Sequence, residues 1–476
     1  MQPTTPAFRH NARVALDDLQ LQRALSGLPG GLVAQRAAAR DRLPEFESLR
    51  EVGRDIRNHA LDHLDLYLEA YERNARAAGA QVHWASSGRD ACDIILKLCR
   101  DAGARLVAKG KSMISEEIGL NAHLEAAGLE IVETDLGEYI LQIRHETPSH
   151  IIAPAIHLTQ EQVEADFRRE HTLLPADRRL VEPADLVGEA RQVLRAKFLA
   201  ADVGITGANF LIAETGSSII VTNEGNGDLT QSLPKVHIVI ASIDKVVPTL
   251  EDVTTLLRLL ARSATGQEIT SYTTFSTGPR RERDPDGPGA YHVVLLDNGR
   301  SELLGGELRE VLRCIRCGAC MNHCPVYNAV GGHAYGWVYP GPIGAVLTPA
   351  LIGVEKGGNL PNASTFCGRC ESVCPMKIPL PRLMRHWREV ELTQVGPASR
   401  LYGLGLSTWG ALARRPRLYH LAMRFAAAGL GMLGRRRGAL RWLPLTGGWT
   451  RHRDLPAPQG RTFQQLWAES ERGVPR

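Results

Sequence analysis

Seven of the nine cysteines lie between positions 314 and 374, in two motifs that each end in proline. The first motif is Cys314-Ile-Arg-Cys317-Gly-Ala-Cys320-Met-Asn-His-Cys324-Pro325. Its C-x2-C-x2-C-x3-C-P spacing is typical of two-cluster ferredoxins, in which the fourth cysteine serves the other iron–sulfur cluster. Three thiolates on one tight loop reach three corners of a single cubane, whereas the fourth lies one helical turn further on and points elsewhere. The motif therefore predicts iron–sulfur ligation and electron transfer.

The second motif, Cys367-Gly-Arg-Cys370-Glu-Ser-Val-Cys374-Pro375, is the first motif without its leading cysteine, and Ser364 occupies that position. Crossed ligation assigns one cluster to Cys314, Cys317, Cys320 and Cys374, and the other to Cys324, Cys367 and Cys370. We expect two [4Fe-4S] clusters. At the second one, either Ser364 or an external ligand caps the fourth iron, or the three thiolates hold a [3Fe-4S] cluster instead.

Zinc is the alternative metal for clustered thiols. A zinc site needs four nitrogen or sulfur ligands, so seven cysteines would complete one site and leave a poor second one. Crossed cubane ligation explains the first motif, which a zinc ribbon does not, so iron–sulfur is favoured. An insert rich in glycine, proline and aromatic residues separates the two motifs, and it favours helices around the ligand loops over a small β-ferredoxin. His333 in this insert is an alternative ligand, although a role in a shielding loop is the stronger interpretation.

The composition is ordinary for a soluble protein, with 43% hydrophobic and 23% charged residues and a net charge of +4, which argues against a polyanion binder. The N-terminus shows no apolar signal region, and no run reaches ~18 apolar residues. We therefore expect a cytoplasmic protein without a membrane span. In that reducing compartment, clustered thiols are metal ligands rather than disulfides. Cys92 and Cys99 are seven positions apart on one face of an apolar helix, and they are expected to be core residues.

Four regions are expected along the chain. They are an N-terminal helical region over 1–69, an α/β domain over 70–300, a two-cluster ferredoxin-like domain over 301–391 and a basic helical extension over 392–476. Alternation of strand and helix patterns over 70–300 indicates a partly parallel sheet. Within that region, Pro183 begins one helix, Thr159 and Thr249 begin two others as capping residues, and Ser115 caps a helix that runs to Gly128.

The extension is distinguished by its charge. Residues 392–453 contain no Asp or Glu and eleven arginines. Packing on the protein or docking of an acidic partner is the favoured interpretation, and peripheral contact with an anionic membrane is the weaker one. Nucleic-acid binding is not expected.

Candidate substrate groups are few. Glu214 ends a predicted strand, where α/β domains place ligands, and it is a candidate for an anion site, with a simple turn as the rival interpretation. Lys109 and Lys111 follow another strand and either face an anionic ligand or lie in a solvated loop. His237 sits within an apolar strand and is expected to be a satisfied core histidine. The stretch 204–209 lacks the G-x-G-x-x-G spacing of a dinucleotide site.

Several motifs resemble those of the lactate utilization protein B family of iron–sulfur proteins. They are Cys314-Ile-Arg-Cys-Gly-Ala-Cys, Gly331-Gly-His-Ala-Tyr-Gly, Gly341-Pro-Ile-Gly-Ala-Val-Leu-Thr-Pro, Ser364-Thr-Phe-Cys-Gly-Arg-Cys, Gly204-Ile-Thr-Gly-Ala-Asn, Asn223-Glu-Gly-Asn-Gly-Asp and Pro456-Ala-Pro-Gln-Gly-Arg-Thr-Phe, which span nearly the whole chain. Family members also have seven motif cysteines, so Ser364 is no departure.

The resemblance implies a fold and a role. It implies that 70–300 is similar to the ribose-phosphate isomerase and CoA-transferase group, and that the cysteine region is similar to α-helical ferredoxins. It also implies that the chain acts with two sister proteins in oxidising L-lactate to pyruvate. We therefore expect an electron-transfer component of a lactate-oxidising complex rather than an enzyme on its own, with an unidentified electron acceptor. The alternatives are an iron–sulfur subunit of another dehydrogenase and a cluster-based redox sensor.

Overall fold

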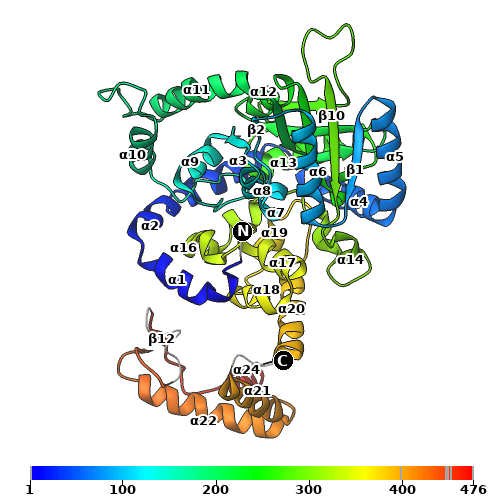
Figure 1. Ribbon diagram of the computed structural model, residues 1–476. Coiled ribbons are helices and arrows are strands. Elements are labelled where there is room, and N and C mark those ends of the chain that lie inside the picture. Colours follow the sequence, from blue (N-terminus) through cyan, green and yellow to red (C-terminus); the bar gives the residue numbers. More distant parts are fainter. Residues whose placement is uncertain (1–2, 397–398, 445–449, 451–452, 474–476) are drawn as a thin grey trace. The chain divides into compact units, whose positions relative to one another are not determined.

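A six-stranded sheet organises the α/β part of the chain in the computed structural model, which describes residues 3–396, 399–444, 450 and 453–473 (Figure 1). All five neighbouring strand pairs are parallel, which confirms the expected α/β domain. In spatial order the strands are β1 (Gln81–Ala85), β10 (Ala290–Leu296), β7 (Val236–Ser242), β4 (Val203–Gly207), β2 (Leu106–Lys109) and β3 (Glu130–Glu133).

Helices cover both faces of this sheet, so its strands are nearly continuous apolar runs. Successive side chains of a strand point to opposite faces. In β7, Ile238 packs in the buried cluster with α6 (Gly88–Asp101), whereas Val239 packs in the cluster with α5 (Leu64–Ala77). Figure 1 shows α5 and α6 flanking β1 and β10. The sheet is therefore a rigid platform whose strand ends can position loops.

Predictions for individual buried residues are confirmed. Cys92 and Cys99 lie in α6 and are 2% and 0% exposed, as core thiols should be. His237 is 1% exposed, and its Nε2 lies 2.8 Å from Thr206 Oγ1, so its polar ring is satisfied within the core.

A second sheet has four strands, which lie between β4 and β10 in the chain. It contains both parallel and antiparallel strand pairs. Its order is β8 (Val246–Val247), β5 (Phe210–Ile212), β6 (Ser217–Thr222) and β9 (Tyr272–Ser276). The β5–β8 pair is parallel, and the other two pairs are antiparallel. Glu214 lies in the turn between β5 and β6 of this smaller sheet, and not at the strand ends of the parallel one.

Most helix boundaries match the sequence signals. The structure has α10 (Gln160–Glu170) after a Thr159 capping box, α11 (Pro183–Ala200), and α13 (Leu250–Ala264) capped by Thr249. The prediction of one helix from Ser115 to Gly128 is wrong. Ser112 caps α7 (Met113–Ile118), and Gly119, at φ 69°, ends that helix before α8 (Leu120–Ala126) begins.

The cysteine region is built from short helices and turns. Its helices are α14 (Arg300–Leu304), α15 (Ala319–Asn322), α16 (Pro325–Val330), α17 (Gly341–Ile352), α18 (Val354–Gly357), α19 (Arg369–Ser372) and α20 (Leu380–Gln394). The N-terminal helices pack on this region, and they are α1 (Phe8–Asp17), α2 (Leu19–Leu25), α3 (Ala34–Asp41) and α4 (Phe46–Asp62). Phe8, Leu25 and Phe46 share one buried cluster with Cys317 and Cys374.

By its internal contacts the chain divides into two units, residues 1–395 and 396–476. The second unit contains α21 (Arg400–Ala413), α22 (Pro416–Gly434), the short β11 (Ala439–Leu440) and β12 (Leu455–Pro456) pair, and α24 (Phe463–Gly473). Among the described residues, no helix combines the length and apolar character that crossing a membrane requires.

Candidate metal centres

Two loops of the cysteine region repeat the same backbone conformation. In the first loop, Arg316 has φ 59° and Gly318 has φ 73°, and α15 follows. In the second, Phe366 has φ 53° and Gly368 has φ 77°, and α19 follows. A non-glycine residue at positive φ is uncommon, so two of them at equivalent positions indicate a shared loop geometry. Each loop curls back on itself so that its side chains converge.

Ser364 occupies the place of Cys314 in this repeat. Both residues follow a 3₁₀ turn and have nearly the same backbone angles, φ −64° and ψ 122° for Cys314 against φ −66° and ψ 135° for Ser364. The N–H of Arg316 lies 3.4 Å from Cys314 Sγ, and the N–H of Phe366 donates to Ser364 Oγ at 3.1 Å. The serine therefore presents a hydroxyl where the first loop presents a thiol.

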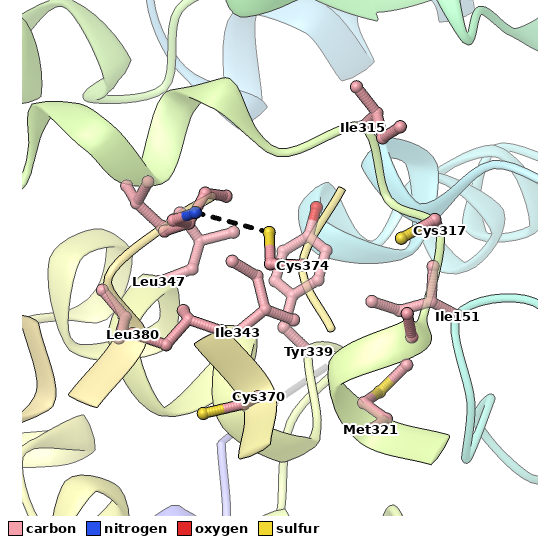
Figure 2. Close-up of a cluster of buried hydrophobic side chains, with 14 of the residues drawn as sticks. Ile151, Ile315, Cys317, Met321, Tyr339, Ile343, Leu347, Cys370, Cys374 and Leu380 are labelled. Carbon is pink, nitrogen blue, oxygen red and sulfur yellow. Dashed lines mark hydrogen bonds between the residues drawn. The ribbon is translucent and has the colours of Figure 1, made fainter. Parts of the chain in front are cut away.

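The first cavity is lined mainly by apolar side chains. The structure brings together Cys314, Cys317, Cys320 and Cys374 around it, which is the first of the two sets expected from the spacing. Figure 2 shows Cys317 and Cys374 among apolar side chains that include Ile151, Ile343 and Leu380.

These four thiols fit a metal centre better than they fit a core of free thiols. Burial raises the pKa of Cys317 to about 12 and that of Cys374 to about 11, and it raises the pKa of Cys320 as well. A buried thiol becomes a thiolate ligand when a cationic metal stabilises its charge. The donor set is four sulfur atoms in one pocket, which matches one cubane cluster.

Two arginines of the N-terminal helices hold the second motif in place. Arg36 Nη2 of α3 donates to the carbonyl oxygen of Val373 at 2.8 Å, and Arg50 Nη2 of α4 donates to that of Cys374 at 2.7 Å. Both side chains are buried. Arg50 also forms an ion pair with Glu47 at 2.7 Å, whereas a negatively charged cluster would compensate the charge of Arg36. Sequence analysis missed both arginines, although their positions on amphipathic helices gave a possible signal.

The second cavity lies at the surface. Cys324, Cys367 and Cys370 line it together with Ser364 and Thr365, among other residues. Cys367 is exposed, and the backbone N–H of Arg369 lowers the pKa of its thiol. Three thiols and a neighbouring hydroxyl fit either a four-iron cluster with one oxygen or external ligand, or a three-iron cluster.

Comparison with known proteins agrees with this geometry. Family models match three parts of the chain, the LUD domain at residues 68–296, a 4Fe-4S dicluster domain at 310–378 and the C-terminal domain of lactate utilisation protein B at 384–472. Lactate utilization protein B of a Geobacillus species is 42% identical and covers 98% of both chains, and that of Bacillus subtilis is 41% identical over 99% of this chain and 98% of its own. The chain belongs to the lactate utilization protein B family.

One solved structure was also matched. A DUF162 family protein from Deinococcus radiodurans is 15% identical and covers 49% of this chain and 98% of its own, with a TM-score of 0.27. That score is too low to carry an argument about the fold. The parallel sheet, the LUD domain match and the dicluster match together support a role of this lactate utilization protein B family member in lactate utilization with iron–sulfur clusters.

The remaining candidate residues of this family member take structural positions. Glu214 is exposed, and its Oε2 accepts a hydrogen bond from the N–H of Leu250 at 2.9 Å, in the first turn of α13. His333 Nε2 lies 2.7 Å from the carbonyl oxygen of Thr147, and His333 lines neither cysteine cavity. Its contact with Thr147 agrees with the shielding-loop interpretation.

Lys109 and Lys111 have different environments. The solvated-loop interpretation is wrong for Lys109, which is 0% exposed and whose Nζ lies 2.8 Å from Glu133 and 3.2 Å from Glu116. Glu138 also lies 3.9 Å from Lys109 Nζ, so three glutamates surround the buried ammonium group. Lys111 instead lines a cavity at the strand ends.

Proposed function

We propose that this chain is the iron–sulfur electron-transfer subunit of a cytoplasmic complex that oxidises L-lactate to pyruvate. One observation carries the proposal, namely that a cysteine site with two buried thiols, Cys317 and Cys374, lies next to a site whose Cys367 thiol is exposed. A buried centre is protected from solvent, and an exposed centre can exchange electrons with another protein. Family membership supplies the link to lactate.

The proposed ligands follow the two cavities. Cys314, Cys317, Cys320 and Cys374 would hold the first [4Fe-4S] cluster, and Cys324, Cys367 and Cys370 would hold the second. Ser364 is the proposed protein ligand at the fourth position of the second cluster, because its hydroxyl repeats the place of the Cys314 thiol. A [3Fe-4S] cluster at this site is the alternative. When bound, each cluster accepts and releases one electron at a time.

The chain holds the two sites close together. Helix α15, which carries Cys320, packs against α19, which carries Cys370, and the charge of Cys370 contributes to the raised pKa of Cys320. Oxidation of L-lactate to pyruvate releases two electrons and two protons. Two neighbouring one-electron centres therefore match the electron count of one turnover.

The sister lactate-utilization proteins are the proposed partners. The second unit supports docking to an acidic protein surface, because its described part exposes large apolar side chains among its arginines. Trp409 is 61% exposed and Phe425 is 72% exposed. Aromatic residues and arginines are enriched where proteins dock.

Growth experiments test the proposal. In a strain that lacks this chain, Cys317→Ala should abolish growth on L-lactate and leave growth on glucose unchanged, because the first site loses a ligand. Cys99→Ala is the matched control, since it removes a core thiol from α6 and should support growth on both carbon sources. Undiminished growth of the Cys317→Ala strain on L-lactate would contradict the proposal. An equal growth defect on glycerol 3-phosphate would favour another dehydrogenase instead.

A further inference from the structure

A cavity of about 360 Å³ lies at the carboxyl ends of three neighbouring strands of the parallel sheet. Its walls include Lys111 after β2, Asn209 after β4 and Lys245 after β7. The strand order reverses at β2, which has β3 on one side and β4 on the other. Open α/β sheets bind ligands outside the carboxyl ends of their strands at such a reversal. The volume lies in the range of small-molecule sites.

The opposite wall of this cavity is the first cysteine loop. Ile151, Ile315 and Arg316 line both this cavity and the first cysteine cavity. Lys245 Nζ also donates to the carbonyl oxygen of Cys314 at 3.3 Å. A molecule in the strand-end cavity would therefore be separated from the first cluster by little more than the loop that carries Cys314 and Cys317.

Cationic groups converge on the same end. The guanidinium of Arg316 lies 4.8 Å from the centroid of the Tyr339 ring, and its buried Nη1 has no hydrogen-bond partner among the described residues. Lys111 Nζ donates to the carbonyl oxygen of Ile152 at 2.6 Å, and its charge interacts with the Glu224 carboxylate in the same cavity. Arginine and lysine arranged in this way favour a carboxylate.

Two carboxylates also line the cavity, but each is engaged with the start of α9 (Leu136–Arg144). Asp135 accepts from the N–H of Glu138 as the N-cap, and Glu224 accepts from the N–H of Leu136 at 3.4 Å. The cluster-loop side offers Arg316 and Lys245, and the buried Asp244 beside them is shared with a third cation, Arg300. The cavity thus has an acidic side that is occupied by the protein itself and a cationic side that faces the first cysteine loop.

We infer that this cavity binds a small carboxylate of the 2-hydroxy or 2-oxo acid class, held against the first cluster. The choice of acid class rests on the proposed function, whereas the preference for an anion rests on the cavity itself. Asn209 and Ser112 add hydrogen-bonding side chains to the lining for a hydroxyl or keto oxygen.

Binding to the holoprotein alone tests this inference. Anaerobic titration calorimetry with L-lactate and with pyruvate should show saturable binding, whereas the uncharged analogue lactamide should not bind. Lys111→Gln should weaken binding at least about tenfold, since it removes a positive charge from the cavity lining. Lys235→Gln is the matched control, because Lys235 is exposed and precedes the amino end of β7. Equal iron contents in both variants exclude cluster loss as the cause.

A spectroscopic readout separates the cavity from a general anion effect. A saturating acid should shift the EPR signal of the first reduced cluster and leave that of the second unchanged. Absence of saturable binding, equal binding of lactamide, or equal affinities of the two lysine variants would overturn the inference. If the binding tests failed but lactate still reduced the clusters in the presence of the sister proteins, the electron-transfer role would stand and only the assignment of the cavity would fall. Binding without any lactate-driven reduction would instead remove the proposed function.

Discussion

Tyr339 and Tyr71 are both 0% exposed, but only one of their hydroxyl groups has a partner. The Tyr339 hydroxyl donates to Glu117 Oε2 at 2.6 Å and so ties the cysteine region to α7 of the α/β domain. The Tyr71 hydroxyl has no hydrogen-bond partner among the described residues. Tyr339→Phe and Tyr71→Phe therefore both remove a buried hydroxyl group, which is hydrogen-bonded in Tyr339 and lacks a partner among the described residues in Tyr71.

The expected change in stability depends on which groups lose a hydrogen-bond partner when each hydroxyl is removed. A buried hydrogen bond to a charged group contributes about 1.5–3 kcal/mol. Glu117 keeps Arg300 at 2.7 Å and Asn298 at 2.7 Å, so Tyr339→Phe does not leave an unpaired charge, and the larger cost of a broken buried ion pair does not apply. Tyr71→Phe removes an unsatisfied polar group and should be neutral or stabilising.

The assay is the rate of unfolding in denaturant, because cluster loss makes unfolding irreversible and the stability kinetic. Far-ultraviolet circular dichroism under anaerobic conditions reports it. If the bond to Glu117 breaks before the transition state, Tyr339→Phe should unfold up to about 10–150-fold faster than the unaltered protein. Tyr71→Phe should unfold no faster. Equal rates for the two variants, or a faster Tyr71→Phe, would refute this reading of the hydrogen bonds.

Three further predictions concern the cysteine sites and the core. Cys374→Ala should change the EPR signal of the first cluster although it lies in the second motif, and Cys324→Ala should change only the second signal; the reverse pattern would disprove crossed ligation. Ser364→Cys should slow iron loss from the second site to a chelator, and an unchanged rate would argue against a ligand at this position. Burial lowers the pKa of His237 to about 3, from ~6.5 when unfolded, so folding stability is lost as pH falls below ~6.5. At pH 5 the loss is about 2 kcal/mol, and His237→Gln should remove it from the difference between denaturation curves at pH 7 and pH 5.

Much of the local structure could be predicted because its signals are local. Thr159 and Thr249 begin their helices as capping residues do, and His237 lies in the core as an apolar strand requires. The helix proposed from Ser115 failed because Gly119 adopts a left-handed conformation, which divides the segment into two helices. Glycine permits that conformation without demanding it, so the break carries no clear sequence signal.

The two sets of cysteines can be predicted from the sequence, whereas the lining of the strand-end cavity cannot. Spacing within and between two short motifs predicts two sets of thiols, and the thiols of each set line one cavity. The cavity instead joins Lys111, Asn209, Lys245 and Arg316, which are far apart in the chain. Only the strand order brings them together, and no local pattern encodes that order. The burial of Lys109 among glutamates depends on the same long-range packing.

Reduction of the clusters by L-lactate, followed by EPR, tests whether this chain carries electrons from lactate. The chain is purified anaerobically with intact clusters and is mixed with L-lactate, with and without the sister proteins. Both cluster signals should appear only when the sister proteins are present, and Cys374→Ala should selectively alter the first signal. Failure of L-lactate to reduce either cluster in the complete mixture would contradict the proposed role, and so would reduction of the isolated chain by L-lactate, because lactate would then be oxidised without the sister proteins.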